Sequence, residues 1–132
     1  MARARVASEC TVKVKNEIGA GAKVAECVAR AGVNLTAVCG YGYGEEAHFL
    51  LIPDDAQKAS SALQAGGFSC EMGEVAVVEA ANRPGAMADI LRRVADAGID
   101  VDYAYASASG SGDALCVLKV ADAARAVTAL NG

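Results

Sequence analysis

The residues with the clearest chemical potential form the segment Asn82–Met87, which reads NRPGAM. Pro84 fixes the backbone angle at which the chain enters a helix, and Gly85 lacks a side chain, so a ligand can approach the backbone closely. The first turn of the following helix has N–H groups without intrahelical acceptors, and with the helix dipole they attract a carboxylate. Asn82 adds a donor and an acceptor, which suits an ammonium group beside a carboxylate. The segment predicts a zwitterion-binding loop, although the same pattern is typical of a strand-to-helix turn that binds nothing.

Other reactive residue types do not form a catalytic pattern. The single histidine, His48, falls within a predicted strand, where a lone histidine is more often structural than a ligand. Arg83 either pairs with a ligand carboxylate or is solvated. No nucleophile stands in a motif that supplies a general base. We therefore expect no enzymatic activity and no catalytic residue.

The cysteines do not indicate a metal site or a disulfide framework. They are odd in number, widely spaced and without a C-x-x-C pair: Cys10, Cys27, Cys39, Cys70 and Cys116. We expect small apolar side chains in a reducing compartment, with no metal and no cofactor. The glycine-rich run Cys39–Glu45 is predicted to be a turn between strands and not a phosphate loop, which would precede a helix.

Two matching segments contain the elements that must position the loop. Asn16–Leu35 reads NEIGAGAKVAECVARAGVNL, and Asn82–Val101, 66 residues further along, reads NRPGAMADILRRVADAGIDV. Without a gap, 8 of the 20 positions are identical, including an asparagine at the end of a strand and the glycines before and after a helix. This spacing indicates a duplicated domain.

Each copy is expected to follow the order strand, helix, strand, strand, helix, strand. Alternating or apolar runs predict strands at Thr11–Lys15, Val33–Cys39, Ala47–Ile52, Phe68–Met72, Glu74–Ala80, Ile99–Tyr105 and Ala114–Val120. Apolar stripes at helical spacing predict helices that end near Gly32, Leu63, Gly98 and Leu130. The order predicts an α+β fold of two ferredoxin-like βαββαβ repeats, residues 1–72 and 73–132.

The second repeat lacks an evident final strand. The sequence ends at Asn131-Gly132, where that strand should begin. Either a sheet edge stays open or another segment fills it. An open edge invites pairing with a second subunit.

Composition and charge exclude several classes of protein. The net charge of −4 and the pI of about 4.9 argue against binding to nucleic acid, whose backbone requires a basic patch. No apolar run reaches 18 residues, and no apolar segment follows Arg3 and Arg5 as in a signal peptide. We expect a cytoplasmic protein that contacts neither nucleic acid nor a membrane. The apolar fraction of 54% is consistent with further burial in an oligomer.

These motifs resemble the ACT domain, a small-molecule-binding regulatory module. Its signature has two parts. Before the helix stands an asparagine or aspartate, then any one residue, then Pro-Gly and an apolar residue. After the helix stand four residues: glycine, then valine or isoleucine, then asparagine, then an aliphatic residue. The second copy carries this pattern in Asn82–Met87 and, with an aspartate for the asparagine, in Gly98–Val101. The first copy keeps Asn16 and Gly32–Leu35, but Ile18 replaces the proline. The resemblance covers nearly the whole chain.

The resemblance implies a ligand-binding site residue by residue. In ACT domains the loop asparagine and the asparagine after the helix contact the effector, commonly across an interface between two domains. Asn16 and Asn82 match the first position, Asn34 matches the second, and Asp100 departs from it. A carboxylate at Asp100 suits an ammonium group and repels a carboxylate. The candidate ligand-binding residues are Asn16, Gly19, Ala20, Asn34, Asn82, Pro84, Gly85, Ala86, Met87 and Asp100.

The resemblance also implies a function. We expect a non-catalytic regulatory protein that binds a small amino acid or related metabolite at ACT–ACT interfaces, forms a homodimer and acts on a partner metabolic enzyme. Because each copy lacks a different part of the signature, a composite site built from both halves is expected in place of two independent sites. The alternative is a ligand-independent assembly module for a partner enzyme, in which the loops are only turns.

Overall fold

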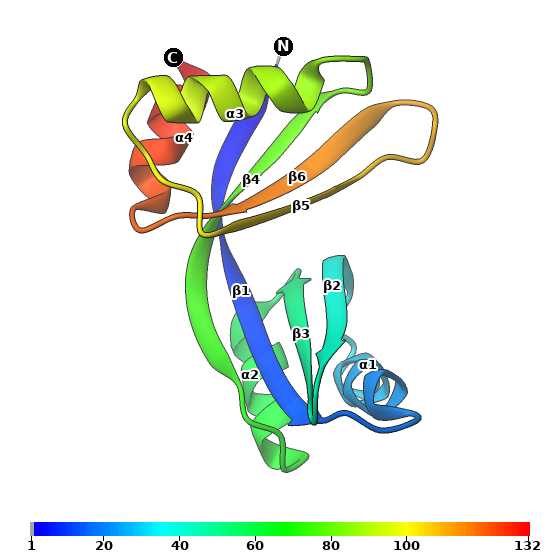
Figure 1. Ribbon diagram of the computed structural model, residues 1–132. Helices are drawn as coiled ribbons and strands as arrows, with labels where there is room; N and C mark the ends of the chain where they lie inside the picture. Colours follow the sequence, from blue (N-terminus) through cyan, green and yellow to red (C-terminus); the bar gives the residue numbers. More distant parts are fainter. Residues whose placement is uncertain (1) are drawn as a thin grey trace. The chain divides into compact units, whose positions relative to one another are not determined.

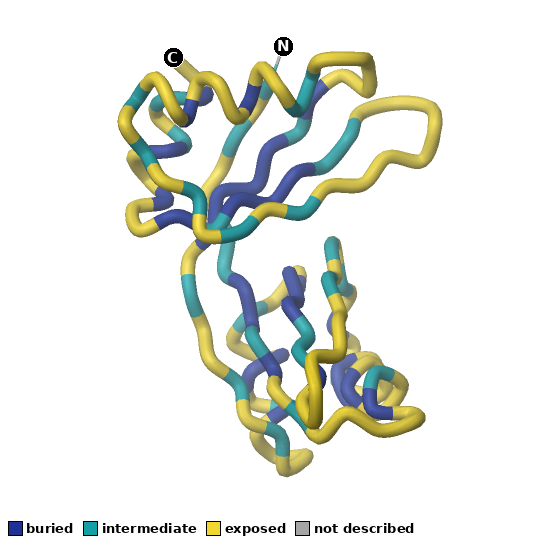
Figure 2. The backbone as a smooth tube through the Cα atoms, in the orientation of Figure 1, coloured by how far each residue is buried: buried dark blue, intermediate teal, exposed yellow. Residues whose placement is uncertain are grey.

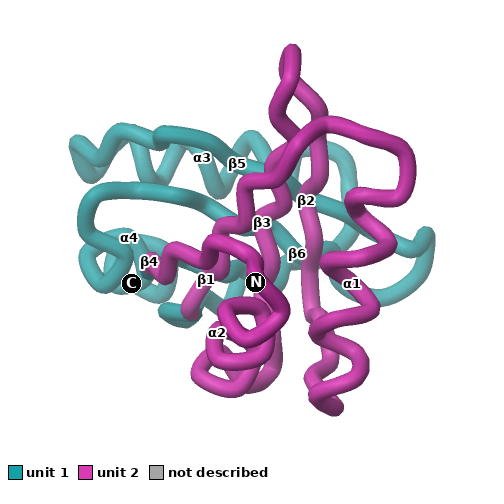
Figure 3. The backbone as a smooth tube through the Cα atoms, turned by 90° about the horizontal axis from the view of Figure 1, so that it is seen from below, with its two compact units in different colours: residues 1–7, 74–132 teal, residues 8–73 magenta. Residues whose placement is uncertain are grey.

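The computed structural model describes residues 2–132, which form two compact units (Figure 3). Unit 2 is Ser8–Gly73, and unit 1 combines Glu74–Gly132 with the described residues up to Ala7. Each unit packs two helices against antiparallel strands, so the predicted α+β fold of ferredoxin-like repeats is confirmed (Figure 1).

Unit 2 contains the complete element order expected for one repeat. Its elements are strand β1 (Arg3–Lys15) from Ser8 onward, helix α1 (Ala20–Arg30), strands β2 (Leu35–Tyr43) and β3 (Glu46–Pro53), helix α2 (Ala56–Ala65) and the start of strand β4 (Glu71–Ala81). Hydrogen bonding orders the strands β2-β3-β1-β4. The core lies between the helices and the sheet and includes Val12, Val24, Val28, Leu51 and Leu63.

Unit 1 repeats this plan, except that the N-terminal part of β1 takes the place of a final strand. After β4 come helix α3 (Ala86–Asp96), strands β5 (Tyr103–Ser107) and β6 (Asp113–Lys119), and helix α4 (Ala123–Asn131). The strand order is β1-β4-β6-β5. Buried residues again concentrate between helices and sheet, among them Val78, Ile90, Val94, Leu118 and Leu130 (Figure 2).

The N-terminal part of β1 occupies the sheet position that the sequence left open in the second repeat. The side chain of Asn131, at the end of α4, accepts a hydrogen bond from Ala4 N at 2.8 Å and donates one to Ala4 O at 2.9 Å. Arg3 forms an ion pair with Glu79 of β4 at 2.6 Å. Of the two alternatives, filling by another segment is the one observed. Residues 2–7, counted with the first repeat in the sequence, cluster with the second.

Strand β2 extends further than predicted. The glycine-rich run expected to be a turn continues as strand to Tyr43, and the turn is confined to Gly44 and Glu45. A Cβ at Gly40 would lie 2.9 Å from the Phe49 ring, and one at Gly42 would lie 2.7 Å from Asn16 Nδ2. These glycines therefore make room for neighbouring side chains within the strand.

Strand β5 starts later than predicted, at Tyr103 and not at Ile99. The Ile99 N–H donates to Val94 O at 3.1 Å, which closes the end of α3. The Asp102 N–H donates to Lys119 O at 2.8 Å. The intervening residues serve as the helix-to-strand connection.

The four helices of residues 2–132 begin in two different ways. Asp55 and Asp122 cap α2 and α4, and each carboxylate accepts from the backbone N–H three residues later at 3.1 Å. Helices α1 and α3 begin after Gly19 and Gly85, both with φ of 87°, and no side chain caps either helix. With 11 residues each, α1 and α3 are the longest helices among residues 2–132, and no helix there has the length and apolarity to span a membrane.

Candidate functional site

The predicted loop of the second repeat lies at the exposed end of β4, where the chain enters α3. Asn82, Pro84 and Gly85 are exposed. The guanidinium of Arg83 folds back, with Nη2 2.6 Å from Asp89 Oδ2 and Nη1 donating to Pro84 O at 3.1 Å. Arg83 therefore pairs with a carboxylate on the helix that follows it, α3, an arrangement that the sequence analysis did not anticipate.

The first turn of α3 presents main-chain donors to this loop. Ala86 N–H donates to Arg83 O at 3.2 Å, and Asp89 N–H donates to Gly85 O at 2.9 Å. The N–H groups of Met87 and Ala88 lie between these two, where a helix offers no intrahelical acceptor. Because no side chain caps α3, these donors are available to an anion.

The loop of the first repeat has the same helix start but a different asparagine environment. Gly19 adopts the same φ as its counterpart, and Ile18, where the second repeat has proline, is fully exposed. Asn16 Nδ2 donates to Gly44 O at 3.1 Å, and Asn16 N donates to Glu45 O at 2.8 Å. Asn16 thus holds the β2–β3 turn against the loop, and one of its amide donors is used for this contact.

Two of the candidate residues turn their side chains toward the core. Ala20 is buried at the start of α1. Met87 packs against the core of unit 1, with its Sδ 3.5 Å from the Sγ of Cys116. At these positions the backbone, and not the side chain, is what a ligand at the loop would contact.

The structure does not bring the two signature asparagine positions together within a unit. Asn34 follows α1 and Asp100 follows α3, and both are exposed. A helix of 11 residues is about 16 Å long, so each lies a helix length away from Asn16 or Asn82. The main chain of Asn34 is tied to Asp54 by two hydrogen bonds of 2.9 and 3.1 Å. A small ligand cannot touch both positions of one repeat.

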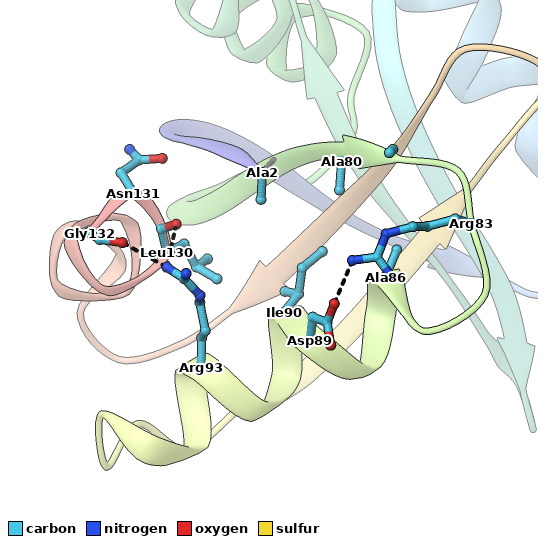
Figure 4. Close-up of a pocket in the computed structure, with 11 residues that line it drawn as sticks. Ala2, Ala80, Arg83, Ala86, Asp89, Ile90, Arg93, Leu130, Asn131 and Gly132 are labelled. Atoms are coloured by element: carbon cyan, nitrogen blue, oxygen red, sulfur yellow. Dashed lines mark hydrogen bonds and ion pairs between the residues drawn. The ribbon is translucent and has the colours of Figure 1, made fainter.

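A separate pocket of about 220 Å³ lies in unit 1 (Figure 4). Its walls come from the end of β4 and the loop after it, from Ala2 just before β1, from α3 and from the end of α4. The lining residues are Ala2, Ala80, Ala81, Arg83, Ala86, Asp89, Ile90, Arg93, Leu130, Asn131 and Gly132. Of the candidate site residues only Ala86 belongs to it. The sequence offered no signal for this pocket, because it depends on the N-terminal strand segment that the sequence analysis did not identify.

The thiols of two core cysteines are held in the protonated form. Burial raises the pKa of Cys116 to about 11. Burial, and to a lesser extent the neighbouring Cys70 and Glu9, raise the pKa of Cys10 to about 12. Within residues 2–132, no cluster of three or more histidine, cysteine or acidic side chains could hold a metal ion.

Fold and loops together define a class: a pair of ferredoxin-like domains, each with a helix that starts at a left-handed glycine after the first strand. The family described as ACT domain pair matches residues 6–131, and the chain belongs to this family. The resemblance noted in the sequence is therefore confirmed.

Solved structures share the fold over most of their length. Protein BT0572 from Bacteroides thetaiotaomicron is 26% identical, with a TM-score of 0.88 over 97% of this chain and 88% of that one. The regulatory subunit of aspartate kinase from Thermus flavus is 18% identical, with a TM-score of 0.65 over 98% and 94%. The ligand-free subunit from Thermus thermophilus is 19% identical, with a TM-score of 0.66 over the same shares. No curated protein sequence matches the chain significantly.

Proposed function

We propose that this protein is a non-catalytic regulatory protein that binds a small amino acid or related metabolite at interfaces between ACT domains. The observation that carries the proposal is the contrast between its helices. Asp55 and Asp122 cap α2 and α4, whereas α1 and α3 begin at Gly19 and Gly85 without a side-chain cap. A ligand carboxylate would supply the missing acceptor at the two uncapped helices.

The distance between signature positions supports a site shared by two ACT domains. Asn16 and Asn34 lie at opposite ends of α1, about 16 Å apart along the helix. A ligand held by the loop of one domain would meet the second asparagine position only on a neighbouring domain. We therefore propose a homodimer whose interface completes the site.

Regulation would follow because ligand binding is thermodynamically coupled to the arrangement of the dimer. A ligand that binds one arrangement of the dimer more tightly shifts the population toward it, which changes contacts with a partner enzyme. The fold shared with the regulatory subunit of aspartate kinase is compatible with such a partner among metabolic enzymes. We propose a cytoplasmic location, where free amino acids are available.

A thermal unfolding assay with each of the common amino acids tests the proposal. A ligand that binds the native state must raise the melting temperature, by more at higher concentration. Asn82→Ala should remove this response without unfolding the protein, because Asn82 is exposed. The matched control is Gln57→Ala, which removes an exposed amide from α2. This variant should keep the ligand-dependent rise in melting temperature. If no amino acid at millimolar concentration shifts the transition, the proposal is wrong.

Exposed apolar side chains favour a second candidate function, a ligand-independent assembly module. Ile18, Val38 and Tyr43 of unit 2 are all largely exposed, which is typical of a surface that contacts another protein. Under this alternative, Asn82→Ala changes nothing, whereas Val38→Asp weakens self-association measured by sedimentation.

A further inference from the structure

We propose that Cys10, Cys70 and Met72 of unit 2 form a binding site for Cu(I), with two thiolates and one thioether as ligands. None of the three belongs to a loop that precedes α1 or α3, and none lines the pocket of unit 1. Cys10 precedes Asn16 by six residues, which is about 20 Å along an extended strand. The site is therefore separate from the loops.

The pairing of β1 with β4 brings two of the sulfurs into contact. The two strands are neighbours in the sheet (Figure 1). Ser69 Oγ accepts from Lys13 N at 3.4 Å and donates to Lys13 O at 3.2 Å. Three residues further on, Met72 Sδ lies 3.2 Å from Cys10 Sγ. The chain after Ser69 therefore runs antiparallel to β1, with Met72 beside Cys10.

Cys70 supplies the third sulfur. Side chains two residues apart along a strand point to the same face, which puts Cys70, one residue before β4, on the side of Met72. The Cys70 side chain packs against the core cluster that contains Cys10. After burial, which is the main cause, the charge and the hydrogen bond of Cys70 also raise the pKa of Cys10. Cysteine spacing alone gave no sign of this group, because only the pairing of β1 with β4 assembles it.

This set of ligands fits Cu(I) better than the other common metal ions of proteins. Thiolate and thioether sulfurs are soft ligands, which select Cu(I). Zn²⁺ is bound by cysteine, histidine and acidic side chains, and no group of three or more of these in residues 2–132 could hold a metal ion. Mg²⁺ and Ca²⁺ require oxygen ligands. A thioether as the third ligand therefore favours Cu(I).

The three sulfurs are accessible from one side only. Met72 is 44% exposed and Cys70 is half-buried, so an ion can enter from solvent, whereas Cys10 is fully buried. Methionine has a flexible side chain that can move aside and then close over the ion. Both thiols release their protons on binding, so the ion with its two thiolates carries one negative charge.

Bound Cu(I) would join β1 to β4 by bonds to side chains of both strands. A metal ion that binds the folded chain more tightly than the unfolded chain stabilises the fold by mass action. The site would thus couple the stability of unit 2 to the supply of copper, independently of any ligand at the loops.

Anaerobic titration of the full, reduced chain with Cu(I), in competition with the chromophoric chelator bicinchoninate, tests the proposal. We expect one Cu(I) per chain, with only sulfur ligands in the X-ray absorption spectrum of the copper. Cys70→Ser should lower the affinity by about 100-fold or more, because loss of a ligand costs more than loss of an outer-shell partner. The matched control is Cys39→Ser, which removes a half-buried cysteine of β2 outside the group and should change nothing.

A second variant keeps the test decisive if Cys70→Ser fails to fold. Met72→Leu replaces an exposed side chain by an apolar one of similar size, so the fold should persist while the affinity falls about tenfold. Asn82→Ala, which alters the loop, should bind Cu(I) as the parent does. Failure to compete with the chelator, unchanged affinity in Cys70→Ser or in Met72→Leu, or an equal loss in Cys39→Ser would each overturn the proposal.

Discussion

At the scale of single residues, the glycines that precede α1 and α3 are required because of their backbone conformation, and not because a side chain would clash there. Gly19 has φ of 87°, and a Cβ built on it meets no atom within 4 Å. We predict that Gly19→Ala destabilises the protein by about 1–2 kcal/mol, because an L-residue in the left-handed region carries that strain. Denaturant unfolding measures this loss. Gly19→Asn should lose less, since asparagine tolerates the left-handed region better; an alanine variant as stable as the parent would contradict the argument.

The buried thiol of Cys10 predicts a dependence of stability on alkaline pH. Its pKa is raised from 9.0 to about 12 by burial first, with smaller contributions from Cys70 and Glu9. Between these values the folded chain keeps the proton that the unfolded chain loses. The stabilisation is therefore complete below about pH 9 and is lost as pH rises toward 12.

Urea unfolding at several pH values between about 8 and about 10.5 measures this effect. The free energy of unfolding should fall with pH less steeply in Cys10→Ala than in the parent, whatever the baseline cost of the smaller side chain. Equal slopes in the two proteins would show that Cys10 titrates normally.

At the scale of elements, the aspartate caps of α2 and α4 should carry measurable stability. Asp55 and Asp122 each accept a hydrogen bond from a backbone N–H in the first turn of their own helix. The corresponding N–H groups of α1 and α3 have no side-chain acceptor. We predict a loss of about 1 kcal/mol for Asp55→Ala and for Asp122→Ala. The Asn variants keep the acceptor and should retain most of the stability in thermal or denaturant unfolding. If Asn and Ala variants are equally unstable, the hydrogen bond is not the source of the effect.

The elements that the sequence predicted are those with strong local signals. Gly32 and Gly98 end their helices where expected, both with positive φ. These features depend on residues close together in the chain. The helices and most strands could therefore be predicted from local chemistry.

The N-terminal strand could not be predicted in the same way. Ala2, just before this strand, and Ala4 within it pack against the core of unit 1 and alternate with the exposed Arg3 and Arg5. Alanine is only weakly apolar, so its alternation with arginine gives a weak strand pattern. In addition, the partner strand lies about 70 residues away in the sequence. The pocket was missed for the same reason. The loops were recognisable as a motif, but the pairing of Arg83 with Asp89 depends on a helix turn that brings them together.

At the scale of the whole molecule, two long strands make the repeats interdependent. β1 provides a first strand to unit 2 and the fourth sheet position to unit 1, and β4 likewise belongs to both. A duplicated sequence has thus become a structure in which unit 2 is one continuous segment, whereas unit 1 combines two segments from opposite ends of the chain. The ends of unit 1 meet where Asn131 bonds Ala4.

This arrangement predicts that deletion of residues 1–7 destabilises unit 1 selectively. The deletion removes the strand beside β4, the Arg3–Glu79 ion pair and both bonds of Asn131, and it exposes an unpaired edge. Cysteine alkylation under native conditions reports each core separately, since Cys116 is buried in unit 1 and Cys27 in unit 2. Cys116 should become reactive in the deletion variant while Cys27 stays protected.

The matched control for this deletion is Asn131→Ala, which removes only the two side-chain hydrogen bonds and should give a smaller increase of Cys116 reactivity. A synthetic peptide of residues 1–9, added in excess, should restore protection, because the strand position needs the segment and not its covalent attachment. The open β4 edge should also make the deletion variant self-associate, which sedimentation detects. If Cys116 stays as protected as in the parent, the N-terminal strand is dispensable and unit 1 is stable without its fourth strand.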